Sequence, residues 1–320
     1  MQEKKEMLKV EGLKKYFQTP AGMLHAVDDV NFSVREGETL GVVGESGCGK
    51  STMGRTILRL HEPTAGSVYF QGKNITGYDR KRLKELRKDM QMIFQDPFAS
   101  LNPRMTVSEA IMEPLLVQGL YKAKDPAIHA QVDKIMDLVG LAKRLVNVYP
   151  HELDGGRRQR IGIARALAIN PKFIVCDEPV SALDVSIQAQ ILNLMQDLQD
   201  ELNLTYLFIT HDLSVVKHFA TDILVMYLGQ MVEKANSDDL FAEPIHPYTK
   251  ALLAAVPQPV VGKDRPQRQL IKGEITSPVN LPDECRFSKR CDFTCDHCLQ
   301  KNPELKKLRP DHFVACTLAK

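Results

Sequence analysis

The sequence predicts an α/β protein with a mostly parallel sheet, an antiparallel strand region before it and a small cysteine-rich extension after it. Short apolar runs alternate with amphipathic helical segments, which is the pattern of parallel strands joined by crossover helices. Residues Leu8 to Val34 instead alternate apolar and polar side chains in two runs, as antiparallel strands do. After about Ala235 the pattern weakens and the cysteines gather. We therefore expect a main domain over residues 1–235 and an extension over residues 236–320.

The predicted elements follow one another in a clear order. Residues Thr39–Val43 form a short apolar run, typical of a strand buried on both faces. A glycine-rich loop comes next, and then a helix over Lys50–Leu60 that ends before Pro63 and Gly66. Three later runs predict further buried strands: Met90–Phe94, Phe173–Cys176 and Tyr206–Ile209. Helical periodicity predicts an inserted helical subdomain at about residues 97–167 and another helix over Ser186–Leu202.

Composition and charge argue against several classes of protein. The formal net charge is +2 and there is no Trp, so neither a basic field nor a base-stacking platform indicates a nucleic-acid partner. The first residues are charged and lead into no apolar segment, which argues against a signal peptide. The longest apolar stretches, such as Ile223 to Leu228, are too short to span a bilayer. We expect a soluble, cytoplasmic chain.

A phosphate-binding loop lies between the strand at Thr39–Val43 and the helix that begins at Lys50. Its glycines let backbone N–H groups turn toward a β-phosphate, and the helix N-terminus favours the negative charge. Lys50 is expected to neutralise the β- and γ-phosphates, and the Ser51 hydroxyl to bind Mg²⁺. The predicted ATP-binding residues here are Gly44, Glu45, Ser46, Gly47, Cys48, Gly49, Lys50, Ser51 and Thr52.

Two carboxylates end the apolar run that begins at Phe173. Asp177 lies at the carboxyl end of a predicted buried strand, where it is placed to hold Mg²⁺ through the water shell of the ion. Glu178 is the candidate base that polarises the attacking water. Together with the phosphate loop, this pair predicts a nucleotide-hydrolysing enzyme.

Further motifs over residues 39–211 resemble those of ABC-type ATPases, in the order of that family. The segment His151 to Arg160 resembles the signature motif, Gln95 the Q-loop, Ser181–Asp184 the D-loop and His211 the switch histidine. The resemblance implies a RecA-like P-loop ABC ATPase core with an antiparallel β subdomain and an inserted helical subdomain. It also implies that Glu178, His211 and Gln95 are catalytic and that Gln95 is a further Mg²⁺ ligand.

Two segments resemble the oligopeptide/dipeptide importer branch of this family. They are Phe94–Pro97 with Ser100–Val107, and His246–Leu253. The resemblance implies an ATPase subunit at the cytoplasmic face of the membrane that powers peptide uptake through two integral membrane permeases, with an extracytoplasmic solute-binding protein. Nickel or another small solute as cargo, and an ATP-binding regulator that does not hydrolyse, remain the alternatives.

An aromatic residue near the N-terminus stacks on adenine in the family that the motifs resemble. Tyr16 and Phe17 both qualify, and the spacing from Leu13 favours Phe17. Tyr16 remains the alternative. Neighbouring residues of a strand point to opposite faces, so only one of the two is expected to stack on adenine.

The signature segment departs from the pattern of the family. That pattern reads Leu-Ser-Gly-Gly-Gln, and here Asp154 replaces the serine and Arg157 the glutamine, around Gly155 and Gly156. A carboxylate facing the phosphate of an opposite subunit would be repelled unless screened, and Arg157 can offset it by pairing with Asp154 or with the phosphate. We therefore expect an asymmetric heterodimer, in which a second ABC ATPase subunit supplies an intact signature.

Five of the seven cysteines lie near the C-terminus. An odd count without an export signal favours a metal or cluster site over a disulfide framework. Four thiolates can hold Zn²⁺ or a [4Fe–4S] cluster, and the resemblance favours the cluster. The expected ligands are Cys285, Cys291, Cys298 and Cys316, with Cys295 as an addition; reduced packing cysteines remain the alternative.

Overall fold

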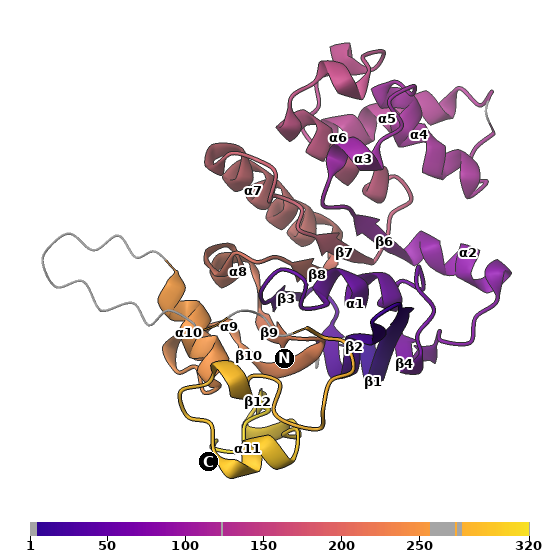
Figure 1. The fold of residues 1–320 in the computed structure, drawn as a ribbon. Coiled ribbons are helices and arrows are strands. Elements are labelled where there is room, and N and C mark those ends of the chain that lie inside the picture. The colour runs from indigo at the N-terminus through magenta and orange to yellow at the C-terminus, as the bar shows by residue number, and fades with distance from the viewer. Residues whose placement is uncertain (1–4, 123, 257–272, 274–276, 320) are drawn as a thin grey trace, which may run out of the picture. The chain divides into compact units, whose positions relative to one another are not determined.

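The computed structural model describes residues 5–122, 124–256, 273 and 277–319 (Figure 1). Residues 257–272 and 274–276 of the predicted extension lie outside the described residues. The chain divides into two compact units, each assembled from segments distant in sequence. The first unit contains Met1–Met7, Arg35–Glu38 and Gly77–Ile209, and the second contains Leu8–Val34, Thr39–Thr76 and Thr210–Lys320.

A parallel sheet forms the centre of the first unit. Its strands are β6 (Met90–Ile93), β7 (Phe173–Asp177) and β8 (Thr205–Ile209), with β7 between the other two. Every residue of β7 and β8 is buried, as expected for parallel strands covered on both faces. Helices α2 (Arg80–Asp89) and α7 (Val185–Leu202) belong to the same unit. The three strands and the helix predicted here are confirmed to within two residues at each end.

Short helices form a separate group within the first unit (Figure 1). α4 begins with a capping box, since Glu109 N–H donates to Thr106 Oγ1 at 3.3 Å while Thr106 N–H donates to Glu109 Oε2 at 2.7 Å. Buried apolar residues such as Ile111 and Val132 hold the group together. Its elements are α3 (Pro97–Ser100), α4 (Val107–Val117), α5 (Ala127–Leu138), η1 (Lys143–Leu145), η2 (Pro150–Glu152) and α6 (Gly155–Leu167).

The second unit contains an antiparallel sheet in the order β2-β1-β4-β5. β1 (Glu6–Thr19) and β2 (Gly22–Arg35) confirm the two strand runs predicted near the N-terminus. Because only Pro20 and Ala21 join these neighbouring strands, they form an antiparallel hairpin. β4 (Ala65–Phe70) and β5 (Lys73–Asn74) extend the sheet and have too little periodicity to be predicted.

Further strands of the same unit include the one before the phosphate loop. β3 (Thr39–Val43) runs parallel to β9 (Asp222–Tyr227), and the order continues through β10 (Gln230–Asn236) and β12 (His312–Val314) to β11 (Lys306–Arg309). The extension therefore adds two strands to the sheet that holds the loop. The helices of this unit are α1 (Lys50–Ile57), α8 (Leu213–Phe219), α9 (Ser237–Ala242), α10 (Pro247–Ala255), η3 (Ser288–Arg290) and α11 (Asp296–Gln300).

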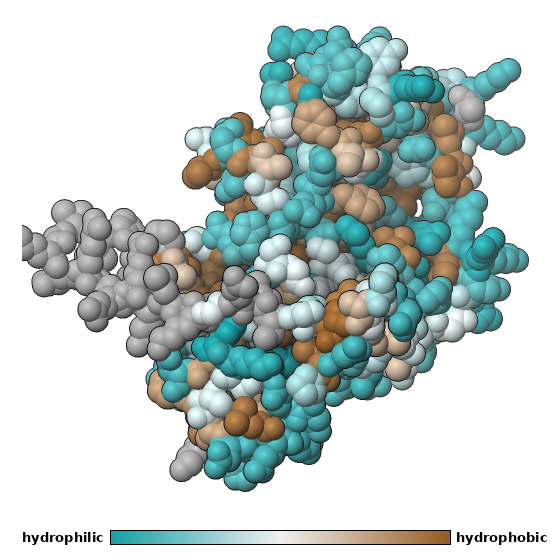
Figure 2. Space-filling view, viewed as in Figure 1, coloured by the Kyte–Doolittle hydropathy of each residue, from teal (hydrophilic) through white to brown (hydrophobic). Residues whose placement is uncertain are grey.

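No helix among the described residues combines the length and the apolar character needed to cross a bilayer. Figure 2 shows hydrophilic residues over much of the visible face, with apolar residues in separate patches. The order of helices and strands confirms the predicted α/β fold, and more residues lie in strands than the sequence indicated.

The extension contains a buried histidine whose titration affects stability. His246 is 2% exposed, its Nδ1 accepts from Tyr248 N–H at 3.0 Å, and burial lowers its pKa from 6.5 to about 4. The folded protein therefore keeps His246 neutral, while the unfolded chain takes up a proton below pH 6.5. Stability from this residue is complete above pH 6.5 and is lost as the pH falls toward 4.

We predict that His246→Asn flattens this pH dependence, because asparagine keeps a capping acceptor and does not titrate. Between pH 7 and pH 5 the free energy of unfolding of the wild type should fall by about 2 kcal/mol more than that of the variant. Urea denaturation at the two pH values measures the difference. Equal losses in the two proteins would contradict the prediction.

Candidate functional site

The phosphate loop packs directly against backbone at both of its ends. A Cβ on Gly44 would lie 2.2 Å from the carbonyl oxygen of Met226, and one on Gly49 would lie 2.0 Å from that of Ala26. Gly49 also has a left-handed φ of +104°. Only glycine can approach these carbonyls so closely. Packing therefore requires glycine at positions 44 and 49, in addition to the need for backbone N–H groups that can reach a phosphate.

Lys50 lies inside the loop that it is expected to serve. The residue is 4% exposed, and its Nζ donates to the carbonyl oxygens of Gly44 at 2.8 Å and Glu45 at 3.0 Å. Gly49 stands at the N-cap of α1 without a side-chain cap, and the first turn carries no acidic residue. The positive end of the helix and the Lys50 ammonium therefore converge on the loop, as anion binding requires.

The aromatic residues near the N-terminus have different partners. The Tyr16 hydroxyl donates to Asp28, and its ring stacks on His25 with 4.2 Å between centroids. Phe17 is half-buried, with the Lys15 ammonium 4.7 Å from its ring centroid. The Phe17 ring also packs edge-on against His61 with 5.7 Å between centroids, so both rings have partners and Phe17 as the adenine-stacking residue stays a prediction.

The acidic end of β7 meets Gln95 in the first unit. Asp177 is fully buried, and Gln95 Nε2 donates to Glu178 Oε2 at 3.1 Å. Glu178 has a left-handed φ of +47°, and its N–H donates to the carbonyl oxygen of Ile209 at 2.9 Å. Strained backbone of this kind persists only where the surroundings impose it, and it is concentrated at functional sites. The structure thus joins two of the predicted catalytic residues.

His211, the third predicted catalytic residue, is exposed and belongs to the second unit. It follows buried Thr210, whose N–H donates to the carbonyl oxygen of Val42 in β3 at 3.1 Å. The backbone before His211 is therefore tied to the strand that leads into the phosphate loop.

Asp154 is the N-cap residue of α6. Its carboxylate caps α6 by accepting from Arg157 N–H at 2.8 Å, and the Arg157 guanidinium pairs with it at 3.3 Å. Serine is an equally good capping residue, so the exchange of serine for aspartate keeps the start of the helix intact. Of the two partners expected for Arg157, the structure shows Asp154.

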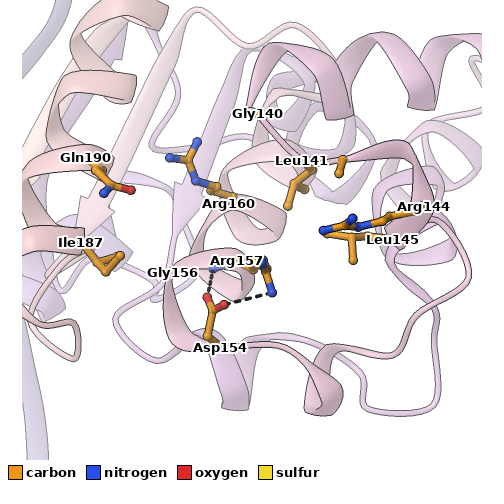
Figure 3. A pocket seen from close by; sticks show the side chains of 11 residues that line it. Gly140, Leu141, Arg144, Leu145, Asp154, Gly156, Arg157, Arg160, Ile187 and Gln190 are labelled. Carbon is orange, nitrogen blue, oxygen red and sulfur yellow. Dashed lines mark hydrogen bonds and ion pairs between the residues drawn. The ribbon is translucent and has the colours of Figure 1, made fainter.

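The signature glycines lie close to neighbouring side chains, which would have to shift to admit a Cβ. A Cβ on Gly156 would lie 2.7 Å from Cγ2 of Ile187, and one on Gly155 would lie 3.1 Å from Cδ2 of Leu183. A cavity of about 310 Å³ lies beside Gly156. Asp154, Arg157 and Arg160 are among the residues that line it (Figure 3). The signature therefore borders a hollow with more positive than negative side chains.

The cysteines of the extension gather in one lobe. Cys285 interacts electrostatically with Cys291, Cys298 and Cys316, and the Sγ atoms of Cys295 and Cys298 lie 3.5 Å apart. Burial raises the pKa of Cys285 to about 11, so this thiol is protonated at neutral pH without a cation beside it. Among the described residues, no three His, Cys, Asp or Glu side chains are grouped as a metal ion would need. The predicted thiols are neighbours, but the geometry does not support a single-ion site.

The sequence reasoning missed two residues that reach the loop from the extension. Tyr248 Oη accepts from Glu45 N–H at 2.9 Å, and the Arg290 guanidinium pairs with the Glu45 carboxylate at 2.7 Å. The sequence around Tyr248 indicates only a family resemblance and not a contact with the loop. Nothing in the sequence pattern links Arg290 to a residue 245 positions earlier.

We predict that Gly49→Ala destabilises the nucleotide-free protein by more than about 2 kcal/mol, because its Cβ meets a backbone carbonyl that cannot move away. Gly47→Ala is the matched control, since Gly47 also has positive φ but a Cβ there would meet nothing within 4 Å. Its cost should be about 1 kcal/mol, from the backbone conformation alone. Chemical denaturation of both variants checks this, and equal costs would contradict the packing argument.

Comparisons with known proteins agree with this geometry. Residues 27–181 match the family described as ABC transporter, and residues 232–298 match the oligopeptide/dipeptide transporter C-terminal region. The oligopeptide transport ATP-binding protein AppF of Bacillus subtilis is 50% identical over 321 residues, which cover 98% of this chain and 97% of the relative. OppF of the same organism is 50% identical over 315 residues, with coverage of 98% and 97%.

Solved structures show the same core. The dimeric structure of a bacterial ABC transporter cassette matches with a TM-score of 0.67 and 31% identity, over 72% of this chain and 99% of the cassette. CbiO1 from Clostridium perfringens, part of an ABC transporter complex, matches with a TM-score of 0.66 and 29% identity, over 75% of this chain and 92% of its own. The chain belongs to the ABC transporter family, within the group of ATP-binding proteins that carry the oligopeptide/dipeptide transporter C-terminal region.

Proposed function

We propose that this chain is the ATP-hydrolysing subunit of a peptide importer. The observation that carries the proposal is the 3.1 Å hydrogen bond from Gln95 to Glu178, which joins two predicted catalytic groups 83 positions apart. The relatives AppF and OppF are named oligopeptide transport ATP-binding proteins, which supports peptides as the cargo. A solved cassette of 31% identity is described in a post-hydrolysis state with ADP and Pi, which supports turnover.

Each site residue has a role that its environment supports. The loop from Gly44 to Ser51, with Thr52, binds the phosphates, and Lys50 exchanges its carbonyl partners for the β- and γ-phosphates. Glu178 polarises the attacking water, and the amide of Gln95 orients its carboxylate. For His211 the proposal keeps the role of the switch histidine, which the order of the motifs implies.

Magnesium is part of this proposal because the donor set suits it. Mg²⁺ prefers oxygen ligands and keeps several waters, so one hydroxyl, one amide and one carboxylate suffice. Ser51, Gln95 and Asp177 would hold the ion, which neutralises charge on the phosphates when bound.

A second ABC ATPase subunit would complete the enzyme. Asp154 places a carboxylate at the start of the signature helix, and Arg157 compensates it through the ion pair at 3.3 Å. Such a signature would serve the ATP of the partner subunit less well than the usual serine, because the charge of Asp154 is only partly screened. An unlike partner with an intact signature would then complete the site built on this chain's own Glu178.

We propose that the two permeases dock on the helical group of the first unit. Phe98 is 61% exposed, and Val117 and Leu120 are 59% and 47% exposed. Exposed apolar side chains such as these are the candidates for a protein–protein contact. Docking there would hold the chain at the cytoplasmic face of the membrane, and a solute-binding protein outside would deliver the peptide.

Two alternatives are separated from this proposal by direct assays. If the reconstituted complex takes up nickel and not labelled peptide, the proposed cargo is wrong and the proposed ATPase activity stands. An assembled complex that binds ATP but releases no phosphate would indicate a regulator. The proposal requires peptide uptake together with phosphate release.

We predict that Glu178→Gln in the assembled ATPase pair retains ATP binding and lowers kcat at least about 100-fold, because the base is lost. Asp154→Ser should change kcat less than about threefold, since serine still caps α6 and the altered signature faces the weaker site. Phosphate release measures both variants. If Asp154→Ser alters turnover as strongly as Glu178→Gln does, the asymmetric heterodimer is wrong.

We further propose a [4Fe–4S] cluster in the extension, with Cys285, Cys291, Cys298 and Cys316 as ligands. Cys285 lies close enough to Cys291, Cys298 and Cys316 to interact with them electrostatically, so these neighbouring thiols are the ones that the extension offers to a cluster. When bound, the cluster would cross-link the lobe.

We predict that protein purified without air is brown and absorbs near roughly 400 nm, from thiolate–iron charge transfer. Cys298→Ala should abolish the colour, whereas Cys295→Ala, which lies outside the proposed ligand set, should keep it. Iron and zinc analysis of the same samples is the check. Colourless protein with one zinc per chain would refute the cluster.

A further inference from the structure

A side chain of the extension neutralises the one carboxylate of the phosphate loop. The Arg290 guanidinium donates from Nη1 to Glu45 Oε2 at 2.7 Å and from Nη2 to Glu45 Oε1 at 2.9 Å. This two-point arrangement is the strongest form of an arginine–carboxylate pair. The Arg290 side chain is only 6% exposed and that of Glu45 22%, so solvent screens the pair weakly.

Rigid packing holds Arg290 in place. Its guanidinium carbon lies 5.8 Å from the ring centroid of Tyr227, and its Nη1 also approaches the Tyr227 hydroxyl at 3.4 Å. The rings of Tyr227, Tyr248 and Phe287 pack against one another with centroids 4.7 to 5.4 Å apart. Arg290 therefore approaches the loop from a fixed aromatic platform.

The same platform also fixes the backbone of Glu45. The fully buried Tyr248 accepts the Glu45 N–H through its hydroxyl at 2.9 Å. The carbonyl of Glu45 in turn accepts from Lys50 Nζ at 3.0 Å. Side chain, amide and carbonyl of Glu45 thus each have a partner, and two of the three partners come from residues 236–320.

Other contacts anchor the extension beside the loop. Arg286 donates to Asp28 and to the carbonyl oxygen of Leu228. Asn280 N–H donates to the carbonyl oxygen of Met23 at 2.9 Å, along the edge of β2. The segment that carries Arg290 is therefore attached to the second unit at Asn280 and Arg286.

Glu45 poses an electrostatic difficulty for a loop that receives phosphates. An unpaired carboxylate there would repel the β- and γ-phosphates and would compete for the Lys50 ammonium. Pairing with Arg290 cancels that charge before the nucleotide arrives. The fixed partner also means that no reorganisation is needed when ATP binds.

We propose that Arg290 is a positioning residue for ATP binding, which acts by neutralising Glu45 and fixing the loop from Gly44 to Ser51. The inference rests on the proposal that this loop is the ATP site. Through the Arg290–Glu45 ion pair, the extension would contribute to nucleotide binding.

The test measures the Kd for ATP of the purified full-length chain by titration with a fluorescent ATP analogue. Arg290→Gln should raise Kd about tenfold, because it leaves the Glu45 carboxylate unpaired beside the phosphates. Because Glu45→Gln removes the charge that Arg290 compensates, the Arg290→Gln/Glu45→Gln double variant should bind ATP at least about threefold more tightly than Arg290→Gln alone. Arg290→Lys keeps the charge without the two-point geometry and should lie between the wild type and Arg290→Gln.

Arg309→Gln is the matched control. It removes an arginine of the extension that pairs with Glu243 at an exposed position, 54% and 64% exposed, so Kd should not change. Thermal unfolding establishes that each variant is folded; if Arg290→Gln is not, Arg290→Lys and the double variant still test the pair.

Rescue by Glu45→Gln separates the proposal from a merely structural role. A double variant that binds as weakly as Arg290→Gln, or an Arg290→Gln protein with wild-type Kd, would overturn the inference. Lys50→Ala distinguishes this from failure of the site itself, because wild-type binding by Lys50→Ala would refute the phosphate loop as the ATP site.

Discussion

The packing of the phosphate loop against bare backbone is the constraint on which the other features depend. Gly44 and Gly49 approach the carbonyls of Met226 and Ala26 so closely that no side chain fits between them. That approach fixes where the loop amides and the Lys50 ammonium point. The same strands, β2 and β9, also receive the extension, through Asp28 and Tyr227. Phosphate loop and extension are therefore built on one scaffold within the second unit.

Charge at the site is arranged in compensated pairs. Arg290 balances Glu45 in the phosphate loop, and Arg157 balances Asp154 in the signature. The two pairs differ in their surroundings, since the first is largely buried while the side chains of the second are 50% and 58% exposed. Solvent weakens the second pair far more than the first. The charge of Glu45 in the phosphate loop is therefore compensated more completely than the charge of Asp154 in the signature.

The sequence predicted what is encoded locally. The phosphate loop, the buried strands and the Asp177–Glu178 strand end were found because their patterns span only a few residues. The left-handed backbone of Glu178 was not, since it depends on the carbonyl of Ile209 in a neighbouring strand. The capping role of Asp154 is predictable from its place before a helix, because aspartate is a preferred N-cap residue. The Arg290–Glu45 pair joins residues 245 positions apart, beyond the reach of any local pattern.

The central claim is that this chain holds a complete set of ATP-binding and base residues but depends on a different subunit for its signature. Phosphate release by the isolated chain, compared with release after titration with the second ATPase subunit, tests it most directly. The account predicts ATP binding with slow turnover for the chain alone, and a rise in kcat that saturates at one partner per chain. Turnover by the isolated chain at the rate of the mixture would contradict it.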